Sequence, residues 1–265
     1  MQRRARWWLP IALVLEPMLE AQSGCVPLAP CYTLDGLVNS ANGQSGYLAP
    51  YTFATLYGTN LSYTEQSRAG SDPLPGIGGV AVMVGGQPAI IFYISATQVN
   101  FLVPAFWTPG PVTVQLFRES TSGPVLTATL LDVAPALFLL PPPDQTMAVA
   151  QLLPNYATDT ADAPAQPGEY VILYATGLGY FGGLPTDDFD PPQIPVQILL
   201  RTQFQVLLDG VAVDDSLVEY VGSVVGYWGL IQINLKLPAN VGSNPEIRLA
   251  IADQTSAAGV HLIVQ

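Results

Sequence analysis

Side chains that could carry out catalysis are scarce in this chain. Its 265 residues include one His and two Cys, the side chains that most often act as general bases, nucleophiles and metal ligands. His261 lies in the apolar run 259–264, where strand alternation places it on an exposed face. No Gly-x-Ser-x-Gly motif accompanies it, and a zinc site would need several His or Cys. The sequence therefore predicts no catalytic residues and a protein that is not an enzyme.

Acidic side chains offer one candidate metal site. Asp187, Asp188 and Asp190 lie close together in a loop of the second half of the chain. Carboxylate oxygens in loops are typical ligands of Ca²⁺, but this spacing lacks the Gly and the distal Glu of an EF-hand loop. A weak calcium site is one interpretation, and a solvated acidic loop is the other. No further cofactor is predicted.

Aromatic side chains are the candidate contacts to a ligand or a partner protein. They occur in three short segments: Trp107, Tyr180 with Phe181, and Tyr227 with Trp228. Rings of this kind, when exposed on loops, stack on sugars or anchor a partner protein. The alternative is that they pack in a core or between domains. Both interpretations remain open at the level of the sequence.

Two further polar pairs recur in the chain. Gln98 with Asn100, and Gln232 with Asn234, each lie two residues apart and therefore on one face of a strand. Their repetition suggests a structural task, such as hydrogen bonding to loop backbone, rather than a ligand site.

Composition and charge exclude several classes of protein. Hydrophobic residues make up 49% of the chain and charged residues 11%, with a net charge of −12 at pH 7. The apolar share is sufficient for a folded core, which argues against a disordered acidic chain. So acidic a protein is a poor partner for nucleic acid, because phosphate neutralisation needs Lys and Arg. No apolar run of about 18 residues predicts a transmembrane span in the mature chain.

The N-terminus has the pattern of a secretory signal peptide over residues 1–23. Three Arg residues precede a short apolar stretch, and small residues follow it. Cys25 and Cys31 come directly after the expected cleavage site, and an oxidising compartment favours a disulfide between them. Alternatively, Cys25 is the lipid-modified residue of a lipoprotein. Residues 24–35 are interpreted as a tether outside the folded body, and an extracytoplasmic location is predicted, whether secreted, periplasmic or on the cell surface.

The remainder of the chain contains two related copies of one sequence. Residues 50–61 match residues 167–178, with a proline, an aromatic residue, Leu-Tyr, Thr and Leu at corresponding positions. Similarity in the same order along both copies indicates a tandem duplication. Two later pairs of blocks complete the match: 82–86 with 206–210, and 98–105 with 232–239.

Each copy is predicted to be a β-sandwich. Alternating runs such as 111–116 and 125–130 are typical of half-buried strands. Gly-Gly and Asp-Gly pairs separate apolar runs in the first and second copy, as the turns of hairpins do. We therefore expect an all-β protein of two tandem immunoglobulin-like β-sandwiches. Their expected bounds are 36–138 and 152–265, joined by a semi-rigid, Pro-rich hinge at 139–151.

Several of these blocks resemble a known family. They are the Leu-Tyr-Gly-Thr-Asn-Leu block at 56–61, the Gly-Gly hairpin, the Gln-x-Asn blocks, the segment 134–138 and the Tyr-Ala-Thr-Gly-Leu-Gly block at 174–179. Together they are similar to the Solibacterales C-terminal domain family of acidobacterial exported proteins and, more distantly, to the IPT/TIG branch of immunoglobulin-like folds. The resemblance spans residues 36–265. It implies tandem immunoglobulin-like domains outside the cytoplasm, and it implies no activity.

Two functional expectations follow. The first is an exported, non-catalytic module for cell-surface adhesion, spacing or protein interaction. The alternative is a surface module that binds carbohydrate or calcium. In either case the expected partner is a protein or glycan at the cell surface, and nucleic acid is not expected to bind.

Overall fold

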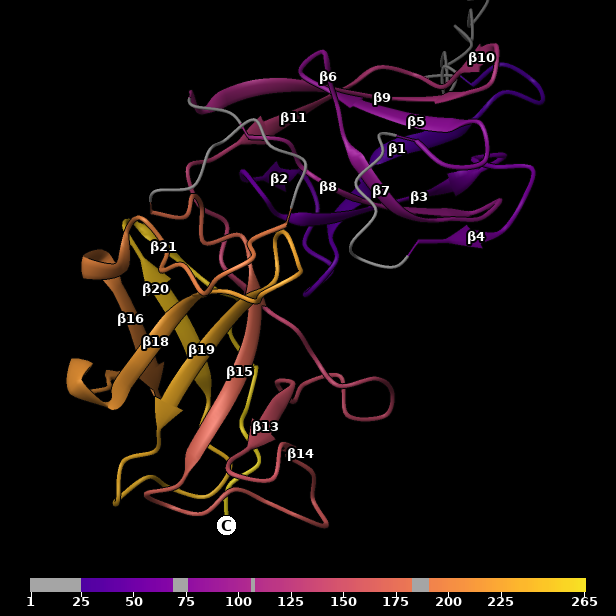
Figure 1. Ribbon diagram of the computed structural model, residues 1–265. Helices are drawn as coiled ribbons and strands as arrows, with labels where there is room; N and C mark the ends of the chain where they lie inside the picture. Colours follow the sequence, from indigo (N-terminus) through magenta and orange to yellow (C-terminus); the bar gives the residue numbers. More distant parts are fainter. Residues whose placement is uncertain (1–24, 69–75, 106–107, 183–190) are drawn as a thin grey trace, which may run out of the picture.

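The computed structural model describes residues 25–68, 76–105, 108–182 and 191–265. The predicted signal peptide lies outside them. The described chain is almost entirely β-structure and forms two β-sandwiches, as the sequence predicts (Figure 1). No helix within the described residues is long and apolar enough to span a membrane.

The first sandwich consists of two sheets. One has the strand order β1-β3-β8-β7-β4, and the other has the order β2-β11-β9-β5-β6, with β10 paired to β9. The strands are β1 (Cys31–Asn39), β2 (Tyr47–Leu48), β3 (Phe53–Thr59), β4 (Gln66–Ser67), β5 (Val80–Val84), β6 (Gln87–Pro88), β7 (Ile90–Ile94), β8 (Gln98–Leu102), β9 (Gly110–Arg118), β10 (Thr121–Ser122) and β11 (Leu126–Leu130).

The second sandwich also has two sheets. One has the order β14-β13-β15-β19-β18, with β12 also paired to β15, and the other has the order β17-β16-β20-β21. The elements are β12 (Ala136–Leu137), β13 (Ala150–Leu152), β14 (Ala157–Thr158), β15 (Tyr170–Thr176), η1 (Arg201–Gln203), β16 (Phe204–Leu208), β17 (Val211–Ala212), η2 (Asp215–Leu217), β18 (Val218–Ser223), β19 (Ile231–Lys236), β20 (Ile247–Ile251) and β21 (Gln254–Thr255).

Residue alternation determines which face of each strand is buried. In β11, Leu126, Ala128 and Leu130 are buried, whereas Thr127 and Thr129 between them are exposed. Such alternation is expected of a strand with one face on the core and one toward solvent. The same pattern occurs in β5, β16 and β20. The sandwiches therefore follow directly from the period-two pattern of the sequence.

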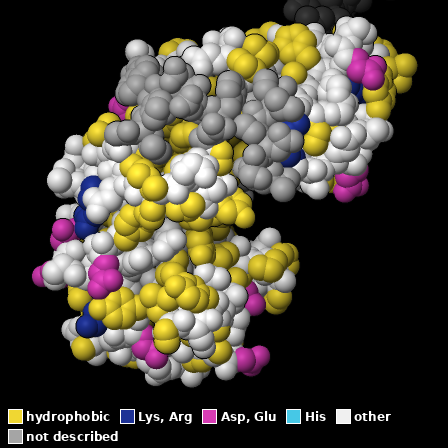
Figure 2. All heavy atoms as spheres, in the orientation of Figure 1, with side chains coloured by type: hydrophobic (Ala, Val, Ile, Leu, Met, Phe, Trp, Pro, Cys, Tyr) yellow, Lys and Arg dark blue, Asp and Glu magenta, His cyan; other side chains and the backbone are white. Residues whose placement is uncertain are grey.

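Each sandwich has its own hydrophobic core, and the two cores meet. Leu56 and Phe101 are fully buried in the first, and Leu173 and Ile233 are fully buried in the second. The second cluster also takes in side chains of the first sandwich, including Tyr51. Figure 2 shows two lobes at an angle, with apolar side chains gathered where they join. The two sandwiches thus share a packed boundary.

The duplication is preserved in the strand register. Tyr57 of β3 lies opposite Gln98 of β8, and in the second copy Tyr174 of β15 lies opposite Gln232 of β19. The predicted hairpin around the Asp-Gly turn forms, as β16 with β17. At the Gly-Gly turn, β5 pairs only with the short β6; the apolar run after it, expected to be the second strand of that hairpin, is β7 and lies in the other sheet beside β8. The repeated blocks therefore occupy equivalent places in the two sandwiches.

The chain enters the second sandwich earlier than the expected boundary at residue 138. β12 pairs with the end of β15, and β13 pairs with the beginning of the same strand. The Pro-rich segment between them is therefore a loop within the second sandwich, not a hinge between the two. Proline lacks the amide donor that a strand needs, which explains why pairing is interrupted there. The short segment 131–135 connects the sandwiches instead.

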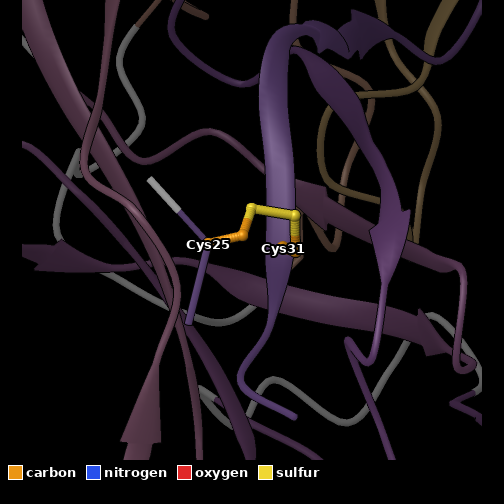
Figure 3. Close-up of a disulfide and its surroundings, with 2 residues drawn as sticks. All are labelled: Cys25 and Cys31. Carbon is orange, nitrogen blue, oxygen red and sulfur yellow. A yellow bond between two sulfur atoms is a disulfide. The ribbon is translucent and has the colours of Figure 1, made fainter. Parts of the chain in front are cut away.

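Cys25 and Cys31 form a disulfide, with their Cα atoms 5.2 Å apart (Figure 3). The loop that this disulfide closes, residues 25–31, is part of the folded body, which corrects the expectation of an external tether. Cys31 is the first residue of β1, and the buried Arg118 guanidinium donates a hydrogen bond to the Leu28 carbonyl at 2.6 Å. The same guanidinium donates to the Asn60 carbonyl at 2.6 Å. Arg118 thereby ties the disulfide loop to the first sandwich.

A buried carboxyl group lies next to β14 in the second sandwich. The Asp159 side chain is fully buried, and its Oδ1 accepts a hydrogen bond from the Ala165 amide at 3.0 Å. Burial disfavours the charged form and raises the pKa of Asp159 from 3.8 to about 6. The folded protein therefore binds a proton at Asp159 more tightly than the unfolded chain does.

We predict that the free energy of unfolding falls as the pH rises from about 4 to about 6. In this interval the unfolded chain releases the Asp159 proton, whereas the folded protein still holds it. Asp159→Asn should remove this dependence and be more stable than wild type at pH 7, by up to about 3 kcal/mol. Urea denaturation at pH 4, 5, 6 and 7 measures both quantities. A wild-type stability that rises relative to the variant over this interval would contradict the prediction.

Candidate functional site

The two sandwiches meet in an aromatic cluster to which both copies contribute. Tyr51, just before β3, lies parallel to Trp228, with ring centroids 5.2 Å apart and an interplanar angle of 7°. Tyr180 meets the Tyr51 ring edge-on at 5.9 Å, and Phe181 lies 6.0 Å from it. Stacked and edge-on aromatic pairs add stability beyond the area they bury. We call these four residues the aromatic joint.

Backbone contacts reinforce the aromatic joint. The Phe53 amide donates a hydrogen bond at 3.1 Å to the hydroxyl oxygen of Thr176, a buried residue at the end of β15. Gly229, directly after Trp228, has a φ of +71°. A Cβ atom at that position would lie 2.5 Å from the Tyr51 carbonyl oxygen. Glycine therefore allows the backbones of the two copies to approach closely.

Three of the five aromatic candidates from the sequence belong to this joint. Phe181 is 5% exposed and Trp228 is 4% exposed, while Tyr180 is half-buried. Their packing against Tyr51 removes Phe181 and Trp228 from the residues that could touch a ligand. Tyr227 is 49% exposed, and Trp107 lies outside the described residues. Of the alternatives left open by the sequence, packing between domains is the one observed for the joint residues.

The remaining sequence candidates do not assemble into a site. His261 is half-buried, and its Nδ1 lies 3.0 Å from the Asn244 carbonyl oxygen. Asp187, Asp188 and Asp190 lie outside the described residues. Within the described ranges, no three His, Cys, Asp or Glu side chains are grouped closely enough to hold a metal ion.

A cleft of about 450 Å³ separates the first sandwich from the loop between β12 and β13. Residues 38–43, Thr55 and Tyr57 line it on the side of the first sandwich, and residues 139–141 and Gln145 line it on the side of the loop. Figure 1 shows this loop extending from the second sandwich below β3. No charged residue is present in the lining. We call this space the junction cleft.

A row of hydrogen-bonded polar side chains runs from the junction cleft across the outer face of the first sheet. The hydroxyl groups of Ser40 and Thr55 are 2.8 Å apart, and Thr55 donates to the Asn100 side-chain oxygen at 3.1 Å. The Gln98 amide donates to the same oxygen at 2.8 Å, and the corresponding Gln–Asn bond of the second copy measures 2.7 Å. In each copy, the glutamine and the asparagine of the pair therefore bond to each other. In the first copy, these bonds fix a polar surface next to Tyr57.

A second hollow, of about 290 Å³, lies on the other side of the β1–β2 loop. It shares Asn39 with the junction cleft and is also lined by Gln44, Tyr47, Gln254 and Thr255. The Tyr47 side chain is 55% exposed. This lining again contains no charged residue. Both hollows therefore combine amides and hydroxyls with an exposed tyrosine.

Sequence reasoning did not single out Tyr57 or Gln145. Tyr57 stands in the repeated Leu-Tyr block, and strand alternation alone places it on the outer face of the first sheet. Tyr57 and Gln145 line the same cleft only because of packing between the sandwiches, which no local pattern predicts. The only signal in the sequence was the repetition of this tyrosine, as Tyr174, in the second copy.

The chain matches no protein-family model and no curated protein sequence. Solved structures give weak similarity. The surface glycan-binding protein PbSGBP-B from Prevotella bryantii shares 10% identity at a TM-score of 0.27, over 83% of this chain and 39% of that one. The SGBP-B protein of the Bacteroides ovatus mixed-linkage glucan utilization locus shares 12% identity at a TM-score of 0.32, over 83% and 43%.

The titin domains z1z2, in a complex with telethonin, share 16% identity at a TM-score of 0.20, over 89% of this chain and 96% of that one. The chain spans about two fifths of the length of the two bacterial glycan-binding proteins. Identities and TM-scores this low carry no argument about function.

We predict that Trp228→Ala destabilises the protein by about 3–5 kcal/mol and uncouples the sandwiches, because it removes the ring that stacks on Tyr51. Tyr227→Ala is the matched control, since the neighbouring ring is exposed. Differential scanning calorimetry should show one transition for wild type and for the control, and two separated transitions for Trp228→Ala. Equal effects of the two substitutions would contradict this role of the joint.

Proposed function

We propose that the chain is an exported, non-catalytic module in which two immunoglobulin-like sandwiches act in adhesion, spacing or protein interaction at the cell surface. The observation that carries this proposal is the aromatic joint. Two domains on a flexible linker adopt many relative orientations, whereas a packed apolar boundary favours one. A tandem unit of fixed geometry suits a protein that holds a binding surface at a set position.

The aromatic joint is built for rigidity rather than for exposure. Tyr51 and Trp228 are both buried, and the Thr176 hydroxyl accepts a hydrogen bond from the backbone of the other sandwich. Separating the sandwiches would expose these rings to water and leave buried polar groups of Thr176 without that partner. This cost opposes opening of the joint.

Three features support an extracytoplasmic location. The leader over residues 1–23 has the pattern of a signal peptide, and the Cys25–Cys31 disulfide is of a kind that persists in oxidising compartments. The sequence resemblance to the Solibacterales C-terminal domain family, a family of exported proteins, supports the same location.

Carbohydrate binding is the second candidate function. It is favoured by one observation, the uncharged polar lining of the two hollows beside Tyr47 and Tyr57. Calcium binding was the other part of that alternative, and its candidate ligands Asp187, Asp188 and Asp190 lie outside the described residues.

Fixed geometry is tested by electron paramagnetic resonance distance measurement. Spin labels on cysteines introduced at the exposed positions Thr127 in β11 and Gln205 in β16 report the separation of the two sandwiches. We expect a single narrow distance distribution for the oxidised mature chain, broadened by Trp228→Ala. A broad distribution in the otherwise unchanged protein would overturn the proposed spacing role.

Export is tested with a fusion of residues 1–35 to alkaline phosphatase, which becomes active only after leaving the cytoplasm. We expect activity from the fusion and its loss when Arg3, Arg4 and Arg6 are replaced by Glu, because a signal peptide needs its basic head. Retention of an inactive wild-type fusion in the cytoplasm would contradict the proposed location.

A further inference from the structure

We infer that the junction cleft binds a neutral carbohydrate chain, with Tyr57 as its aromatic contact. The inference rests on the proposed function as a surface module, and it gives that module a site and a ligand class. Sugars offer hydroxyl groups at the ring edge and C–H groups on the ring face. A site for them needs amides and hydroxyls together with an exposed aromatic ring.

Comparison of the two copies identifies Tyr57 as the open position. In the second copy, Tyr174 is half-buried, and its hydroxyl donates a hydrogen bond at 2.6 Å to the side-chain oxygen of Gln151 on β13. In the first copy, Val38 of β1 stands where Gln151 stands in the second. Val38 lies opposite Thr55 in the strand register, and Gln151 lies opposite Ile172, the residue that matches Thr55 in the repeat.

A valine side chain cannot accept a hydrogen bond. The Tyr57 side chain remains 49% exposed at the cleft, and its hydroxyl bonds to no other side chain in the described ranges. The two matching tyrosines therefore differ: Tyr174 is covered by Gln151, whereas Tyr57 is exposed and accessible to a ligand.

An irregularity in β1 keeps Tyr57 uncovered. The register between β1 and β3 shifts between Tyr32 and Leu37, directly opposite Tyr57. Residues 33–36 of β1 therefore stand opposite the single residue Tyr57, and a bulge in a strand changes the direction of neighbouring side chains. Gly36 in the bulge approaches the Tyr57 backbone closely, since a Cβ there would lie 2.5 Å from the Tyr57 carbonyl oxygen. The interrupted pairing beside the Tyr57 ring is thus a feature of the sheet itself.

Charge selects a neutral ligand over an anionic one. The lining of the cleft contains no Lys or Arg to pair with a carboxylate or a sulfate. The whole chain carries a net charge of −12, and removal of the leader would take away three Arg and only two Glu. An anionic polysaccharide would therefore be repelled, whereas a neutral one would meet no electrostatic barrier.

Size and polarity fit a segment of polysaccharide. A volume of about 450 Å³ lies within the usual range for small-molecule sites. Ser40, Thr55 and Gln145 bring hydroxyl and amide groups to the lining, and the hydrogen bonds among Ser40, Thr55 and Asn100 hold their side chains in place. The second hollow, around Tyr47, begins at the shared Asn39 and offers uncharged contacts to further sugar units.

The experiment is calorimetric titration of the mature chain with cellohexaose, maltohexaose and mannohexaose, and with an alginate hexamer as the anionic counterpart. We expect at least one neutral hexasaccharide to bind and the alginate hexamer not to bind. Tyr57→Ala should weaken that binding by about tenfold or more, because the ring contributes buried contact area. Tyr156→Ala is the matched control, since Tyr156 is an exposed tyrosine of the second sandwich, and it should leave the affinity unchanged.

Val38→Gln provides a second variant that does not truncate the ring. It places in the first copy the acceptor that covers Tyr174 in the second, and it should lower the affinity while the melting temperature stays at or above that of wild type. Absence of binding by all three neutral hexasaccharides at millimolar concentration would overturn the inference, as would preferential binding of alginate. Binding that survives both Tyr57→Ala and Val38→Gln would also overturn it. None of these results bears on the distance and export measurements, so failure of the ligand site and failure of the proposed function remain distinguishable.

Discussion

The stacking of Tyr51 on Trp228 is the contact on which the arrangement of the whole chain depends. Each sandwich has a core of its own, and a β-sandwich of about 100 residues is large enough to be stable alone. What makes the pair one body is the apolar boundary around these two rings, together with the bond from the Phe53 amide to Thr176. The same boundary brings the β12–β13 loop against the first sheet. The junction cleft exists because the joint is closed.

The two copies show how one pattern can serve two purposes. The Gln-x-Asn pairs form the same internal hydrogen bond in both sandwiches, and the Tyr–Gln register is the same. The neighbouring strand differs. β13 supplies a glutamine that covers Tyr174, whereas β1 supplies a valine and a bulge beside Tyr57. A duplication permits this difference, because both copies can keep the residues that form the fold while one of them changes its surface.

Much of the fold could be predicted from the sequence, because its signals are local. Alternation predicted the strands, the Gly-Gly and Asp-Gly pairs predicted turns, and the repeated blocks predicted two related domains. The strand β7 after the Gly-Gly turn nevertheless pairs in the other sheet, which no local pattern indicates. The joint and the cleft could not be predicted in the same way. Trp228 could have been exposed or buried, and only Tyr51, far away in the chain, decides the matter. The Pro-rich segment after residue 138 was interpreted as a hinge, because pairing of β12 and β13 to the same strand is a long-range property.

The aromatic joint is a head-to-tail contact, in which different surfaces of the two copies meet. Contacts of this type do not close on themselves, so a third sandwich could in principle be added by the same rule and give a growing array. The sequence opposes such growth. Where the first copy has Pro50 followed by Tyr51, the second has Pro167 followed by Gly168 and the exposed Glu169. The ring is replaced by a flexible residue and a negative charge, so the second copy cannot repeat the contact that the first one makes.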